Sequence, residues 1–152
     1  MDEGKNFRYL EHTADIKFEA FGKTYEEVFE NSGYAFSNLV VDTDKVEKNI
    51  VKKINLSSED IISLLYDFLE ELIILLEVEH FVVSVISKVE LDRENNRIFV
   101  KLIGDKTNDE NQGKYGFRYN VKAVTYNDMK IEKRKILDDG SEELVATVVV
   151  DI

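Results

Sequence analysis

Residues 9–16 read Tyr9-Leu10-Glu11-His12-Thr13-Ala14-Asp15-Ile16, and the organisation of the whole chain depends on where the fold places them. This stretch holds one histidine and two acidic side chains directly after an apolar opening. The chain closes on an apolar run, residues 148–150, that is followed by Asp151 and Ile152. If the fold brings the two stretches together, Asp15, Asp151 and the α-carboxylate of Ile152 form a cluster of hard oxygen ligands. Such a cluster suits a divalent cation such as Ca²⁺ or Mg²⁺.

Around the first stretch, the sequence predicts two short strands and a helix. Apolar residues alternate with polar ones between residues 7 and 22, and this period of two is typical of half-buried strands. Thr24 is followed three residues later by Glu27, which is the pattern of a capping box. We therefore expect a helix that begins at Thr24 and ends at about Leu39.

The middle of the chain predicts a further strand and a second helix. Residues 46–56 alternate apolar side chains with lysines, which indicates a strand with one wet face. Ser57 or Ser58 is expected to cap the following helix, and Asp60 to support it by its charge near the helix N-terminus. The helix should run to about Leu76, with an apolar stripe wide enough for a central core helix.

The last part of the chain is rich in β-structure. Residues 81–91 and 97–103 predict a hairpin, and residues 104–116 a polar loop with three glycines. The expected fold class is α+β: a single domain over residues 1–152, with mostly antiparallel β-sheet packed with two main α-helices. The remaining strands are expected at 118–126, 129–137 and 144–150, with a hairpin turn at 138–141.

Composition excludes several classes of function. The chain has 152 residues and no cysteine, which excludes disulfides and zinc–thiolate sites. Its net charge of −11 opposes tight direct nucleic-acid binding unless a local basic patch overrides it. No apolar run is long enough to cross a bilayer, and the polar residues 1–5 do not resemble a secretory signal. We expect a cytoplasmic protein without a membrane partner.

Four residues are candidates for chemistry, and each has a structural alternative. His12 could be a general base, a ligand or a structural residue, and only one other histidine, His80, is present. Asp15 could bind a cation or satisfy the amides of a turn. Asp151 could act as a ligand or simply end a strand, and Lys122 could face solvent or serve as a counter-charge to the acidic cluster. No glycine-rich phosphate loop or nucleophile elbow is recognisable.

Four segments together resemble the archease family: residues 9–16, residues 21–29, the strand Val121-Lys122-Ala123-Val124-Thr125-Tyr126, and the closing residues 149–152. The likeness spans both ends and the middle, so it covers essentially the whole chain. The resemblance implies a small α+β protein that is not itself an enzyme and assists an RNA ligase of the RtcB type in tRNA splicing. Family members are understood to promote transfer of GMP onto the ligase's active-site histidine, and so to support multiple turnover.

The resemblance also implies roles for particular residues. It assigns a divalent metal site to Asp15, Asp151 and Ile152, the last through its main-chain carboxylate. Ca²⁺ is the expected ion, with Mg²⁺ or Mn²⁺ as alternatives. Lys122 and His12 are expected to act in partner binding or activation. Many relatives carry a histidine where this chain has Asn127.

Two other functions remain open from the sequence. The chain could be an independent metal-dependent phosphoester hydrolase that uses Asp15, Asp151 and His12. It could also be a metal-free adaptor or chaperone-like binding protein. Turnover of a phosphoester by the isolated protein would favour the first, and a melting temperature unaffected by Ca²⁺ or Mn²⁺ would favour the second.

Overall fold

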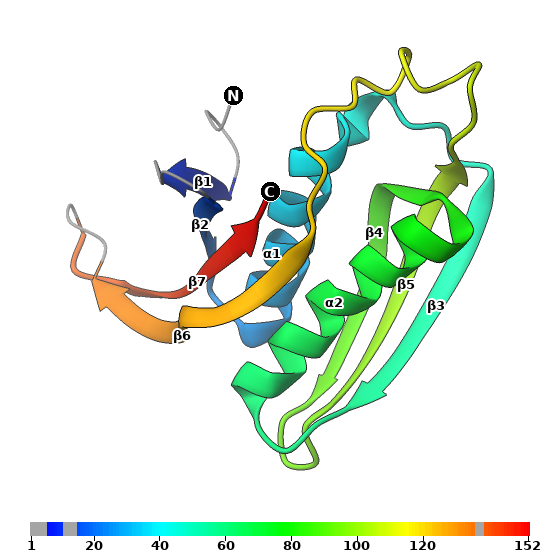
Figure 1. Cartoon of the computed structure of the whole chain (residues 1–152). Helices are drawn as coiled ribbons and strands as arrows, with labels where there is room; N and C mark the ends of the chain where they lie inside the picture. Colours follow the sequence, from blue (N-terminus) through cyan, green and yellow to red (C-terminus); the bar gives the residue numbers. More distant parts are fainter. Residues whose placement is uncertain (1–5, 11–14, 136–138) are drawn as a thin grey trace.

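Two antiparallel sheets and two α-helices form the part of the protein that the structure describes (Figure 1). The computed structural model describes residues 6–10, 15–135 and 139–152. One sheet has the strand order β1-β2-β7-β6 and the other the order β3-β5-β4. The predicted α+β class is therefore confirmed. In chain order the elements are β1 (Phe7–Leu10), β2 (Asp15–Gly22), α1 (Tyr25–Val40), the 3-10 helix η1 (Thr43–Lys45), β3 (Ile50–Ser57), α2 (Ile61–Glu79), β4 (Phe81–Asp92), β5 (Arg97–Lys106), β6 (Ala123–Lys135) and β7 (Glu142–Asp151).

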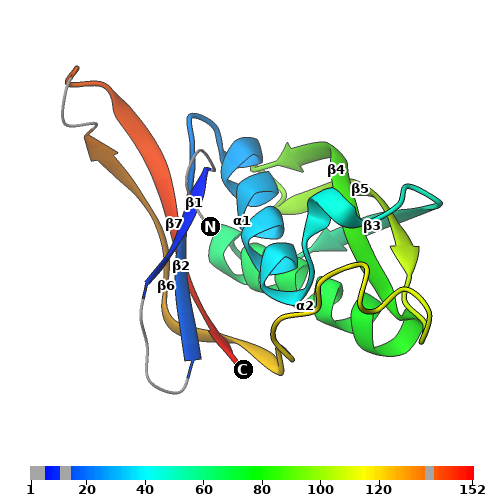
Figure 2. The ribbon, with the colours of Figure 1, turned by 90° about the horizontal axis from the view of Figure 1, so that it is seen from above.

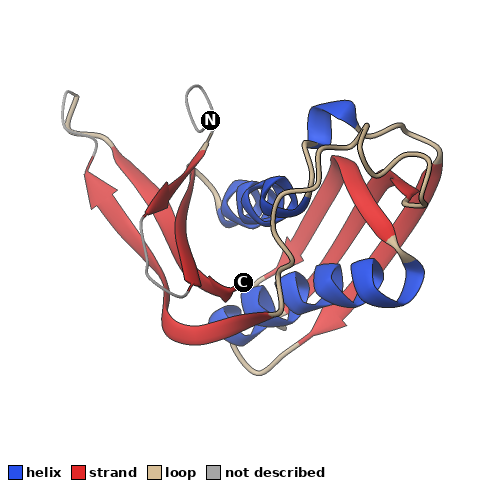
Figure 3. Cartoon of the chain, turned by 45° about the horizontal axis from the view of Figure 1, so that its top comes forward, coloured by secondary structure: helices blue, strands red, loops and turns tan. Residues whose placement is uncertain are grey.

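The first helix lies between the two sheets, and the second covers the three-stranded sheet (Figures 2 and 3). On one side α1 packs against β2, and on the other side against β4; α2 contacts all three strands of the smaller sheet and also β6. One hydrophobic cluster joins these layers, with Phe18 of β2, Phe29 of α1 and Phe68 of α2 all fully buried. No helix in the described part of the chain is both long and apolar enough to cross a membrane.

Local sequence explains the start of α1, and a segment distant in sequence caps its end. The Thr24 hydroxyl accepts a hydrogen bond from the Glu27 N–H at 3.1 Å, so the predicted N-cap is confirmed. At the other end, the last carbonyls accept hydrogen bonds from a distant segment. The Arg118 N–H donates to Val40 and the Tyr119 N–H donates to Leu39. The segment that leads into β6 therefore caps the C-terminus of α1.

The predicted cap of α2 is wrong. Asp60 is the N-cap, and its side chain accepts a hydrogen bond from the Ser63 N–H at 2.7 Å. The Ser58 hydroxyl instead bonds to the carboxylate of Asp67. Aspartate is as good an N-cap as serine, and Asp60 directly precedes the first helical residue. The helix runs one turn past the predicted end, to Glu79, where His80 adopts a left-handed conformation with φ of 56° and terminates it.

Two predicted strand boundaries also need correction. The strand expected from residue 46 begins at Ile50. Residues 43–45 form the 3-10 helix η1, which Asp42 caps, and residues 46–49 connect it to β3 without belonging to a strand. Gly104 is not in a loop but in β5, where it pairs with both neighbouring strands. A Cβ at Gly104 would lie 1.9 Å from the carbonyl oxygen of Val82, so the backbones approach too closely for any side chain.

The third correction concerns the strand that reaches the candidate site. Residues 118–126 and 129–137 were expected to be two strands, but β6 is one strand, Ala123–Lys135, with an interruption in its pairing to β7. Residues 118–122 are not part of a strand. Of the predicted turn, residue 138 lies outside the described residues, and Gly140 has the positive φ of 73° that suits a hairpin turn.

Candidate functional site

The first residue of β2 and the last residue of β7 lie opposite each other. Asp15 is the register partner of Asp151 in the antiparallel pair. Directly opposed residues have Cβ atoms about 5 Å apart and project to the same face. Phe18 and Val148 belong to the core, so the odd-numbered Asp15 and Asp151 face outward, where both are half-buried. The prediction that these two segments meet is confirmed for the residues that carry the carboxylates.

Lys122 lies next to this acidic pair and contacts it through its main chain. Its N–H donates a hydrogen bond to the carbonyl oxygen of Asp151 at 2.9 Å, and the next residue, Ala123, pairs with Asp151 in the sheet. The Lys122 side chain is exposed, and its ammonium group makes no ion pair with a described residue. The lysine is therefore close to the acidic pair without neutralising it.

Of the other two predicted site residues, the structure describes Ile152 but not His12. Ile152 follows Asp151 directly, and its half-buried side chain packs against the core. His12 lies outside the described residues. In the described ranges, no group of three or more His, Cys, Asp or Glu side chains is arranged to hold a metal ion. The predicted metal site is not a group of that kind, because it has only two such side chains, Asp15 and Asp151, and takes its third ligand from a main-chain carboxylate.

A wide bulge in β6 is the feature that sequence reasoning missed. Thr125 pairs with Val149 and Lys130 pairs with Thr147, so residues 126–129 all lie opposite the single residue between those partners. Asp128 in the bulge has a φ of 60°, a conformation that aspartate and asparagine tolerate better than most residues. The Asn127-Asp128 pair was the available signal, since both types favour turns.

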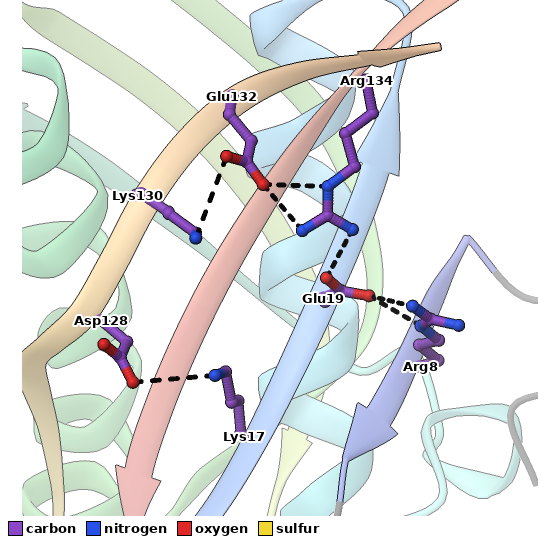
Figure 4. A network of polar contacts seen from close by, with 7 residues as sticks. All are labelled: Arg8, Lys17, Glu19, Asp128, Lys130, Glu132 and Arg134. Atoms are coloured by element: carbon purple, nitrogen blue, oxygen red, sulfur yellow. Dashed lines mark hydrogen bonds and ion pairs between the residues drawn. The ribbon is translucent and has the colours of Figure 1, made fainter. Parts of the chain in front are cut away.

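The bulge attaches β6 to α2 and, across β7, to β2. The Tyr126 ring stacks on the ring of Tyr66 in α2, with centroids 4.1 Å apart and planes 6° apart. Asp128 forms an ion pair with Lys17 of β2 at 3.6 Å, as Figure 4 shows. Asn127 is left exposed between these two contacts. The Asn127 side chain is therefore presented to solvent.

Three large aromatic side chains on the segment around Lys122 are unusually exposed. Phe117 is 41% exposed, Tyr119 42% and Tyr126 54%. We call these three residues the aromatic strip. Large apolar groups that gather on one exposed segment are typical of a protein-binding surface. Of the strip, Tyr126 lies on β6, the strand next to β7 that carries Asp151, whereas Phe117 and Tyr119 precede β6 and belong to no strand.

A charged network fixes the outer face of the four-stranded sheet (Figure 4). Glu19 of β2 has a side chain that is only 5% exposed, and it lies between two arginines. Arg8 of β1 contacts one carboxylate oxygen at 2.7 Å, and Arg134 of β6 contacts the other at 2.6 Å. Arg134 also pairs with Glu132 at 2.7 Å. The network ties β1 and β6 to the central strand β2 on the face that carries Asp15.

The electrostatic state of Glu19 follows from these contacts. Burial by itself raises the pKa of the carboxyl group, but hydrogen bonds and charge from Arg8 and Arg134 outweigh that effect and lower it. Glu19 is therefore ionised in the folded protein and serves as a structural anchor.

Comparison with known proteins identifies the family. The sequence model of the Archease protein family matches residues 7–152. The chain belongs to the archease family. The Protein archease of Methanosarcina barkeri is 41% identical over 152 residues, covering 99% of this chain and 98% of the relative. That of Methanosarcina mazei is 42% identical over 86% of this chain and 89% of its own, and that of Pyrococcus abyssi is 38% identical over 97% and 99%.

Solved archease structures confirm the fold. The solution structure of protein 1598 of Methanobacterium thermoautotrophicum has a TM-score of 0.73 and 31% identity, and covers 97% of this chain and 99% of that one. A crystal structure described as an archease, possible chaperone, from Thermotoga maritima has a TM-score of 0.61 and 22% identity, with 94% of each chain covered. The second likeness bears on the fold alone.

Proposed function

We propose that this archease activates an RNA ligase of the RtcB type, promoting its guanylylation and multiple turnover through a divalent-metal site. The direct opposition of Asp15 and Asp151 at the end of the β2–β7 pair carries the proposal. Membership of the archease family supports it, because the resemblance described above implies a metal at these two positions. The protein would act as an accessory factor and not as the ligase.

Asp15 and Asp151 would hold the ion with their carboxylates, and Ile152 with its main-chain carboxylate. This donor set consists entirely of hard oxygens, which fits Ca²⁺ and also Mg²⁺ or Mn²⁺. Two carboxylates on directly opposed residues repel each other, and a cation between them removes that repulsion. A bound ion would supply positive charge beside the phosphates of a nucleotide.

The neighbouring residues would bring the acidic pair to the ligase. The aromatic strip offers Phe117, Tyr119 and Tyr126 as contacts, and such side chains often dominate the binding energy of an interface. The exposed ammonium of Lys122 can bind an anionic group of the ligase or of its nucleotide. His12, three residues before Asp15, is proposed as a further partner contact.

Ligase turnover with GTP, at limiting ligase, tests the proposal. Asp15→Asn and Asp151→Asn should each abolish the stimulation of turnover while the thermal unfolding of the metal-free protein stays cooperative. Asp109→Asn changes an exposed aspartate in the loop after β5 and is the matched control. Stimulation that survives in both site variants would remove the metal from the mechanism. Stimulation that survives extension of the chain beyond Ile152 would remove the main-chain ligand.

A metal-binding measurement without the ligase separates the site from the activity. Ca²⁺ should raise the melting temperature of the unmodified protein and of Asp109→Asn, but not that of Asp15→Asn. The exposed aromatic strip also favours a second candidate, a metal-free adaptor that binds its partner through this surface alone. That candidate predicts no Ca²⁺ effect on melting and loss of stimulation only in Phe117→Ser or Tyr119→Ser. Phosphoester hydrolysis by the protein alone would instead favour a hydrolase.

A further inference from the structure

One face of the three-stranded sheet is left uncovered by the helices. Both α1 and α2 lie against its other face (Figure 2). Along β5, the buried residues Ile98, Val100 and Leu102 alternate with residues that are half-buried or exposed. The outward set therefore includes Phe99, Lys101 and Ile103 of β5 and their register partners on β3 and β4.

Three lysines form a row across this face. Lys101 of the central strand β5 pairs in register with Lys53 of β3 and with Lys88 of β4. Neighbouring strands are about 4.8 Å apart, so the three side chains start within roughly 10 Å of one another. Like charges on directly opposed residues destabilise a sheet. The row is a local positive patch in a chain that has 31 acidic residues and a net charge of −11.

The row is only partly neutralised within the protein. Lys88 forms an ion pair with Glu90 at 3.1 Å, and both side chains are exposed. Neither Lys53 nor Lys101 forms an ion pair with a described residue. Lysines are common on edge strands, where they discourage pairing with another chain, and this explains Lys53 and Lys88. It does not explain Lys101, because β5 is the central strand.

A shallow hollow lies next to the lysine row. It has a volume of about 480 Å³ and covers the end of the sheet towards the β4–β5 turn. The Phe99 ring, the Asn55 amide and the Arg97 guanidinium belong to its lining, together with the acidic residues Glu90 and Asp92. An aromatic ring can stack on a nucleobase, and the amide and guanidinium can donate hydrogen bonds to a base or a phosphate. Phe99 is two residues from Lys101 on the same strand and face.

We propose that this face binds a short segment of single-stranded RNA, with phosphates on Lys53, Lys101 and Lys88 and a base against Phe99. The combination favours a nucleic acid over an acidic protein segment, since an acidic segment would need the lysines but not the aromatic hollow. The choice of RNA over DNA rests on the proposed function. Binding is weak and local, because the rest of the surface repels phosphates.

Fluorescence polarisation with a labelled oligouridine RNA tests the proposal directly. Three phosphate contacts on a single strand give a slope of about −2 for the logarithm of affinity against the logarithm of salt concentration. Raising the salt from about 50 to 200 mM should therefore weaken binding roughly 20-fold. The double variant Lys53→Ala/Lys101→Ala should bind more weakly at low salt, and the same salt change should cost it only about threefold.

Two further variants distinguish the outcomes. Phe99→Leu should weaken binding while leaving the salt slope unchanged, since it removes stacking and no charge. Lys52→Ala is the matched control, because Lys52 lies on the helix-facing side of β3 and pairs with Glu79 of α2. The proposal is overturned if the unmodified protein does not bind the RNA at low salt, or if Lys52→Ala is as harmful as the double variant. It is also overturned if polyaspartate competes as well as RNA and Phe99→Leu has no effect.

The same preparations separate this proposal from the proposed function. Asp15→Asn should bind RNA as well as the unmodified protein does, since Asp15 belongs to the other sheet. The double lysine variant should still show the Ca²⁺-dependent rise in melting temperature. If RNA does not bind while ligase stimulation is intact, only the RNA-binding proposal is overturned.

Discussion

Replacing Glu19 with glutamine tests whether the charged network holds the four-stranded sheet together. The side chain is 5% exposed and is held by Arg8 and Arg134 at 2.6–2.7 Å. Removing one partner of a fully buried pair costs about 3–5 kcal/mol. Here the arginines are 54% and 36% exposed, so water can solvate them again, and hydrogen bonds to a charged group are worth about 1.5–3 kcal/mol. We expect Glu19→Gln to lower the free energy of unfolding by about 2 kcal/mol at pH 7.

The pH dependence gives a second, sharper expectation. The pKa of Glu19 is lower in the folded protein than its ordinary value of 4.5. Its ionised form therefore stabilises the fold fully above about pH 4.5, and that contribution is lost as the pH falls through the folded pKa. The difference in stability between the unmodified protein and Glu19→Gln should be constant at neutral pH and shrink in acid.

Urea unfolding from neutral to acidic pH measures both effects. Glu90→Gln is the control, because Glu90 belongs to an exposed ion pair, and such pairs contribute about 0–1 kcal/mol. The reasoning fails if Glu19→Gln costs no more than Glu90→Gln at neutral pH. It also fails if the difference persists unchanged in acid, since a loss that ignores pH would come from packing and not from the charge.

Three further substitutions test the local structure by chemical or thermal unfolding. Gly104→Ala should destabilise the protein by more than about 3 kcal/mol or prevent folding, because its Cβ would lie 1.9 Å from the carbonyl oxygen of Val82; a cost near that of a surface substitution would contradict the close approach. Asp60→Ala should cost about 1 kcal/mol and Ser57→Ala almost nothing, and the reverse order would restore serine as the cap of α2. Burial and a hydrogen bond to Asp105 raise the pKa of Tyr115 to about 12, so Tyr115→Phe should remove the last-titrating tyrosine from an alkaline absorbance titration and leave the other tyrosine transitions in place.

The parts of the fold that the sequence predicts well are those that depend on local patterns. The Thr24 cap and the apolar stripe of α2 need only neighbouring residues, and alternation between residues 7 and 22 was enough for β1 and β2. The cap of α2 was misassigned because three suitable residues occur within four positions, and propensity does not rank them. Gly104 was misread as a loop residue because its role depends on the backbone of β4, more than twenty positions away.

In the candidate site too, the sequence predicts some features and misses those that depend on distant parts of the chain. Asp15, Asp151 and Lys122 could be named from the sequence, and their neighbourhood was predicted through the family resemblance. The bulge in β6 could not be predicted, because it is defined by the register between β6 and β7 and not by residues 126–129 themselves. The exposure of the aromatic strip was missed for a similar reason, since aromatic residues on a predicted strand are normally expected to face the core.

The hydrophobic core fixes the geometry of the acidic pair. Phe18 and Ala20 of β2 and Val148 and Val150 of β7 all point into the core. A slip of one residue in the β2–β7 register would turn one of these sets outward, because side chains alternate between the two faces of a strand. Burying apolar side chains such as Phe18, Val148 and Val150 is worth about 1.5–3 kcal/mol each. Together they exceed the repulsion between two like charges at a protein surface, which is about 4 kcal/mol at a separation of about 4 Å. Core packing can therefore hold the carboxylates of Asp15 and Asp151 opposite each other in spite of their repulsion.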